Sequence, residues 1–141
     1  MSVTLHATCI AIGGRGVLLI GRPGAGKSDL ALRLIDRGAD LVSDDGTLIE
    51  AREDRLIASP PETIAGRIEV RGIGILTIPY RTHVPLALCV ALDQAMPRMP
   101  EEELPTREIE GLTLPLLAIA PFEASAPVKV EQALMLYGLS V

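Results

Sequence analysis

The strongest constraint on the fold is an octapeptide, residues 21–28, which reads Gly-Arg-Pro-Gly-Ala-Gly-Lys-Ser. It matches the phosphate-loop pattern G-x-x-x-x-G-K-[ST]. The apolar run 17–20 before it is typical of a buried strand, and residues 28–37 after it have the period of a helix. In this setting, glycines expose backbone N–H groups to an anion, and the helix N-terminus favours negative charge. The predicted phosphate-binding residues are Gly21, Arg22, Pro23, Gly24, Ala25, Gly26, Lys27 and Ser28.

Two side chains of this loop carry specific chemistry. Lys27 is expected to reach the β- and γ-phosphates of a nucleotide, and the Ser28 hydroxyl is expected to ligate a magnesium ion. In the following helix, one apolar face is predicted to pack on the core, and Gly38 is a natural stop signal. That face comprises Leu30, Ala31, Leu34 and Ile35.

The rest of the chain reads mostly as strands joined by short turns. Strand-like segments are 4–12, 17–20, 40–43, 47–51, 55–59, 67–78, 85–92 and, as an edge or broken strand, 112–119. Residues 96–106 read as an exposed loop, and a terminal helix after Pro127 is expected to have Val130, Ala133, Leu134 and Tyr137 on one face. Since short turns join antiparallel neighbours, we predict a single α/β domain, residues 1–141, with a mixed and largely antiparallel sheet.

Composition excludes several classes of partner. Aromatic residues are only 2% of the chain and the net charge is −5, which disfavours nucleic acid and anionic membranes. Cys9 and Cys89 lie in apolar runs without metal-ligand spacing, as expected of buried thiols in a reducing compartment. No signal peptide and no long apolar span are recognisable in the sequence. A cytoplasmic location is therefore predicted.

Outside the loop, a few polar residues are candidates for catalysis or metal binding. Asp44 and Asp45 follow a predicted strand, where they either project towards the phosphate loop or simply form a turn. Glu69 interrupts an apolar strand and is either a metal ligand or part of a solvated polar face. His6 in the first strand and Arg98 in the proline-rich loop carry little signal by themselves.

Two segments together resemble the HPr kinase/phosphorylase family. The first runs from the phosphate loop through Leu41-Val42-Ser43-Asp44-Asp45, similar to the family's Leu-Val-x-Asp-Asp strand end. The second, Glu69-Val70-Arg71-Gly72-Ile73-Gly74, is similar to its Glu-Ile-Arg-Gly-Leu-Gly signature. The resemblance covers residues 4–80 well and the remainder loosely, as in a short proteobacterial form that holds only the catalytic domain.

The resemblance implies an ATP-dependent kinase for a serine of an HPr-like phosphocarrier protein, with ATP and Mg²⁺ as cofactors. Ser28 and Glu69 would hold magnesium, Lys27 the phosphates, and Asp45, with Asp44, would act as the base. His6 falls where the family has a catalytic-site histidine. A functional family arginine corresponds to Arg98 or to Arg107, of which Arg98 is preferred. A homo-oligomer, a hexamer in the family, is implied as well.

The chain also departs from the family pattern. The Pro-Gly-Arg-Asn segment tied to dephosphorylation reads Pro127-Val128-Lys129-Val130 here, which argues against phosphorylase activity. Shortened C-terminal helices leave the docking of HPr open. Two alternatives therefore stand beside the protein kinase: a P-loop kinase for a small metabolite, and a nucleotide-binding regulatory module that transfers no phosphate.

Overall fold

The computed structural model describes residues 2–141, which form eleven strands, two α-helices and one 3₁₀ turn. The strands are β1 (Ser2–Leu5), β2 (Thr8–Ile12), β3 (Arg15–Ile20), β4 (Asp40–Ser43), β5 (Thr47–Arg52), β6 (Arg55–Ser59), β7 (Arg67–Val70), β8 (Gly74–Thr77), β9 (Val84–Ala91), β10 (Thr106–Ile109) and β11 (Leu112–Ala118). The helices are α1 (Lys27–Asp36) and α2 (Ala126–Tyr137), and the turn is η1 (Glu62–Ile64).

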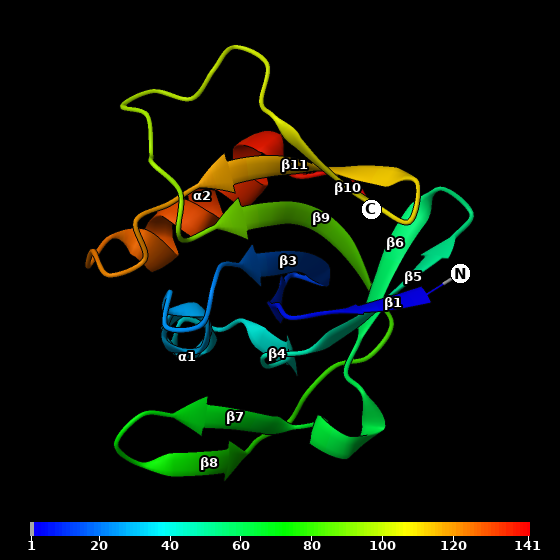
Figure 1. Cartoon of the computed structure of the whole chain (residues 1–141), viewed down its shortest axis with the longest axis vertical. Helices are drawn as coiled ribbons and strands as arrows, with labels where there is room; N and C mark the ends of the chain where they lie inside the picture. Colours follow the sequence, from blue (N-terminus) through cyan, green and yellow to red (C-terminus); the bar gives the residue numbers. More distant parts are fainter. Residues whose placement is uncertain (1) are drawn as a thin grey trace.

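Nine strands form one mixed sheet in the order β1-β5-β6-β9-β3-β2-β4, and β11 joins it beside β9. β9 runs parallel to β3 on one side and to β11 on the other, whereas the other pairs in the sheet are antiparallel. Figure 1 shows the arrowheads of β3, β9 and β11 pointing the same way, with α1 directly beyond the end of β3. The predicted α/β fold with a mixed, largely antiparallel sheet is therefore confirmed.

The core lies on both faces of this sheet because successive side chains of a strand point in opposite directions. Ile10, Val17 and Leu19 pack with α1 and α2 in one buried cluster. Cys9 and Leu18, their neighbours in the sequence, pack on the other face with side chains of β5 and β6. Two-sided burial explains why the central strands are continuous apolar runs.

Both helices form where the sequence predicts them. α1 begins at Lys27 and ends just before Gly38, whose φ of 108° suits glycine and stops the helix. Its predicted apolar face is buried at Leu30, Ala31 and Leu34. In α2, Val130, Ala133 and Leu134 of the predicted face are buried, whereas Tyr137 is 37% exposed because the helix ends at the surface there.

Two predicted segments needed correction, and one strand was missed. The run 4–12 is two strands, because the chain leaves β1, which pairs with β5, and re-enters the sheet as β2. The segment 67–78 is a hairpin, β7 and β8, that forms its own two-stranded sheet. Gly72 and Gly74, with φ of 87° and 127°, permit its turn. The short strand β10 before β11 was not predicted at all.

Candidate active site

The loop between β3 and α1 has the backbone of an anion cradle. Gly24 and Gly26 have φ of 84° and 99°, in the left-handed region that favours glycine. The Ala25 N–H donates to the Arg22 carbonyl at 3.0 Å, which closes the turn. At the start of the loop, the Arg22 N–H donates to Asp93 Oδ2 at 3.0 Å. The residues present therefore fit a phosphate group, since the glycines leave backbone N–H groups open at the helix N-terminus.

The Lys27 side chain reaches back to the start of the loop that carries it. Its Nζ donates to the carbonyl oxygens of Gly21 at 2.7 Å and Arg22 at 3.2 Å, and the residue is only 7% exposed. An ammonium group has three N–H donors, so one is left for a phosphate oxygen.

Asp44 lies at the centre of a buried hydrogen-bond network. Its Oδ1 accepts from Ser28 Oγ at 2.6 Å and from Thr8 Oγ1 at 3.1 Å, and its Oδ2 accepts from the Glu69 N–H at 3.0 Å. The residue is 7% exposed. The Asp44 carboxylate thus links the phosphate loop, the start of β2 and the β7–β8 hairpin.

Asp45 is exposed and faces a cleft beside the loop. The cleft has a volume of about 520 Å³, and its walls include Lys27, Ser28, Asp45 and Glu69. The Asp45 N–H donates to Thr8 Oγ1 at 3.1 Å, which fixes its backbone at φ 61°. Four residues predicted from separate parts of the sequence therefore meet at one surface.

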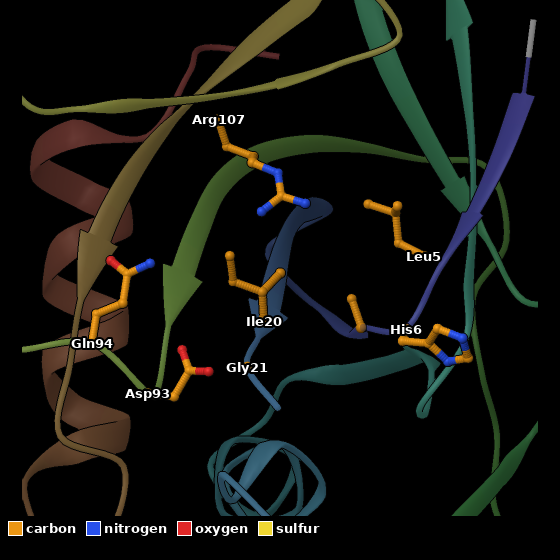
Figure 2. A pocket seen from close by; sticks show the side chains of 8 residues that line it. Leu5, His6, Ile20, Gly21, Asp93, Gln94 and Arg107 are labelled. Atoms are coloured by element: carbon orange, nitrogen blue, oxygen red, sulfur yellow. The ribbon is translucent and has the colours of Figure 1, made fainter. Parts of the chain in front are cut away.

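A second hollow, of about 350 Å³, lies beyond the start of the loop. His6, Gly21, Asp93 and Arg107 line it, and Figure 2 shows the Arg107 side chain pointing towards Ile20. The candidate histidine therefore lies near the first glycine of the loop but outside the cleft that holds Asp45 and Glu69.

Arg98 is in the exposed loop between β9 and β10 and lines neither hollow. Arg107, the candidate that was not preferred, lines the second hollow together with Gly21 of the phosphate loop. Two residues that contact the loop were not predicted. They are Asp93, which follows β9 in the chain, and Phe122, which follows β11.

Comparison with known proteins identifies the family. Residues 1–119 match the family described as the HPr Serine kinase C-terminal domain. The chain belongs to the HPr serine kinase family. Its HPr kinase/phosphorylase relative from Thermoanaerobacter pseudethanolicus is 51% identical over 77 residues, covering 54% of this chain and 25% of that protein. The relative from Geobacillus kaustophilus is 38% identical over 100 residues, covering 65% and 32%.

A solved HPr(Ser) kinase/phosphatase from Coxiella burnetii superimposes with a TM-score of 0.80 at 30% identity, covering 94% of each chain. This likeness confirms the HPr kinase fold over nearly the whole chain. The curated relatives are much longer, since the chain spans only 25% of the first of them. All predicted site residues, from His6 to Arg98, lie within the stretch that matches the family.

The donors for a magnesium ion are few. Within residues 2–141, no three side chains of His, Cys, Asp or Glu gather into a metal cluster. Ser28 and Glu69 share the cleft, which suits magnesium because this ion keeps several waters and also binds substrate phosphates. In the same range, no helix has the length and apolar character needed to cross a membrane.

Proposed function

We propose that the protein is an ATP-dependent kinase that phosphorylates a serine of an HPr-like carrier protein. The observation that carries this proposal is the shared cleft of Lys27, Ser28, Asp45 and Glu69, in a chain of the HPr serine kinase family. Phosphate binding, cation binding and a carboxylate base are the three parts that phosphoryl transfer requires.

The two neighbouring aspartates would have different roles. Asp44 already accepts three hydrogen bonds and is buried, so it would orient Ser28 and the strand that carries Glu69. A hydroxyl has one donor and two lone pairs, so Ser28 can donate to Asp44 and still offer oxygen to a cation. Asp45 is exposed to the cleft and would accept the proton of the attacking serine.

In the proposed reaction, the carrier serine Oγ attacks the γ-phosphorus of ATP and the bond to the β-phosphate oxygen breaks. ADP leaves, and the serine proton passes to Asp45. Lys27 would hold the phosphates throughout, and Ser28 and Glu69 would hold magnesium, which neutralises developing negative charge when bound. By resemblance, we also assign supporting roles to His6 and Arg98.

The experiment is a transfer assay. The purified protein is incubated with γ-labelled ATP, magnesium and the organism's HPr-like protein, and acid-stable phosphoserine on the carrier is measured. We expect labelled phosphoserine. ATP binding without any transfer to the carrier would contradict the proposal and favour a regulatory nucleotide-binding module.

Location and assembly belong to the same proposal. We expect a cytoplasmic protein, in keeping with two free and buried cysteines, Cys9 and Cys89. We also expect a homo-oligomer, a hexamer by family resemblance, which analytical ultracentrifugation measures directly.

A further inference from the structure

One aromatic side chain lies open at the edge of the phosphate loop. Phe122 is the single phenylalanine of the chain, and it is 71% exposed. Single exposed apolar side chains are common on protein surfaces, so the significance of this ring lies in its place in the lining of a concave polar cleft. Phe122 also lies beyond residues 1–119, the stretch that matches the family.

The topology brings Phe122 to the loop. β3, β9 and β11 run parallel, so their carboxyl ends lie at one edge of the sheet, which is where ligands bind in α/β folds. The phosphate loop follows β3, and the segment with Phe122 follows β11 (Figure 1). The ring therefore reaches the loop although about a hundred residues separate them in the sequence.

The ring packs directly on the loop backbone. A Cβ built on Gly26 would lie 2.9 Å from the Phe122 ring, so one part of the ring covers the bare Cα of this glycine. Arg33 of α1 holds the segment in place, since its guanidinium donates to the carbonyls of Pro121 and Glu123. The position of the ring relative to the phosphate site is thus fixed by the helix that follows the loop.

The cleft offers both charged and apolar groups. Phe122 is the one aromatic residue in its lining, which also includes the charged Lys27, Asp29, Asp45, Glu69 and Arg71 and the apolar Leu32 and Val70. A nucleotide needs both kinds of contact, because it has charged phosphates at one end and a flat, apolar-faced base at the other. Aromatic rings bind bases by stacking because every base offers a π-face.

We propose that Phe122 is the base-binding residue of the cleft, and that the adenine ring of the nucleotide stacks on it. This inference rests on the proposed use of ATP and adds the part of the site that holds the base. Since stacking does not depend on hydrogen-bond patterns, Phe122 is expected to support GTP as well as ATP.

The first test separates the base from the phosphates. Binding of ATP and of inorganic triphosphate is measured by calorimetry for the wild type, for Phe122→Ala and for Met135→Ala. Met135 is a matched control because it is 64% exposed on α2 and lines neither hollow. We expect Phe122→Ala to weaken ATP roughly 5- to 150-fold, the range for one lost stacking contact, and to leave triphosphate binding unchanged.

Two results would overturn the proposal. One is equal weakening of ATP and triphosphate binding in Phe122→Ala, which would mean that the ring only shapes the loop. The other is unchanged ATP affinity in Phe122→Ala; if the KM for the carrier were raised as well, the ring would be a docking contact for protein.

A second variant tests stacking without removing the ring. The chain contains no tryptophan, so Phe122→Trp places a single indole at the site. We expect ATP to quench its fluorescence and inorganic triphosphate to leave it unchanged. An equal response to both ligands, or no response to ATP at saturating concentration, contradicts the proposal. Since these readouts need no carrier, failure of phosphoserine formation would overturn the proposed kinase activity and leave the base site standing.

Discussion

Asp44 and Asp45 are neighbours in the sequence but differ sharply in environment. Asp44 is buried with three donors on its carboxylate, whereas Asp45 is exposed with φ of 61°. An aspartate or asparagine tolerates this left-handed backbone better than most residues. Asn is therefore the right replacement at position 45, because it removes the charge without straining the turn.

For Asp45→Asn, we expect ATP affinity within about twofold of wild type and phosphoryl transfer lowered by roughly 10²- to 10⁴-fold, the usual contribution of a general base. Calorimetry and single-turnover kinetics measure the two quantities. Asp54→Asn, in the exposed turn between β5 and β6, serves as the control and should behave like the wild type. Normal transfer by Asp45→Asn would assign the base to another residue.

Lys27→Ala tests the loop itself. Loss of a charged hydrogen bond to phosphate costs about 1.5–3 kcal/mol, so nucleotide affinity should fall by at least about tenfold, and activity should be lost. Lys129→Ala is a suitable control, because this lysine of α2 pairs with Glu123, in the turn before the helix, at 2.9 Å and lines neither hollow. If Lys27→Ala bound ATP with wild-type affinity, the loop would not be the phosphate site.

At the level of single residues, the site residues that belong to a sequence motif could be predicted, and the site residues outside any motif could not. The loop, Asp45 and Glu69 belong to recognisable segments, and the structure brings them to one cleft. Asp93 and Phe122 follow β9 and β11 with no pattern of their own. Their positions depend on parallel pairing between distant strands, which the local sequence does not specify.

Among the elements, α1 connects the site to the core. Leu34 is completely buried between the sheet and α2. For Leu34→Ala, we expect the free energy of unfolding to fall by about 2–5 kcal/mol, the cost of lost burial and a cavity. Urea denaturation measures this, with Leu136→Ala as the control, since Leu136 is 69% exposed and should change stability by less than about 0.5 kcal/mol.

Helices and strands were predicted correctly where the hydrophobic period and the turn residues indicated the same element boundaries. Leu30, Ala31 and Leu34 share a helical face, and Gly38 marks its end. The β7–β8 hairpin was wrongly read as one strand, because β7 alternates between exposed and buried residues whereas β8 has no such alternation to mark a second strand. β8 is exposed along its whole length, so burial did not shape its sequence.

For the whole molecule, the two buried thiols are expected to make the folded state less stable at alkaline pH. Burial raises the pKa of Cys89 to about 12 and that of Cys9 still higher, from an ordinary value of 9.0. Below pH 9 both are neutral in the folded and unfolded chains. Above pH 9 the two thiols ionise only in the unfolded chain, so the folded state loses stability as the pH rises from about 9 towards 12.

Each thiol should lower the free energy of unfolding by up to about 1.4 kcal/mol per pH unit in this window. Urea denaturation under reducing conditions at pH 8, 9, 10 and 11 gives the slope. The Cys9→Ala/Cys89→Ala double variant should have a shallower slope, whatever its stability at pH 8, and Cys89→Ala alone an intermediate one. Identical slopes for all three proteins would mean that the thiols ionise in the folded state.

The parallel contact between β3 and β9 has a consequence for biosynthesis. Gly16 pairs with Leu86, so the strand before the phosphate loop acquires its central neighbour only after β9 has left the ribosome. Proteins rich in such distant pairings fold slowly. We therefore expect nascent chains in which β9, up to Ala91, has not yet left the ribosome to lack a nucleotide-protected state, so the cleft is completed late in translation.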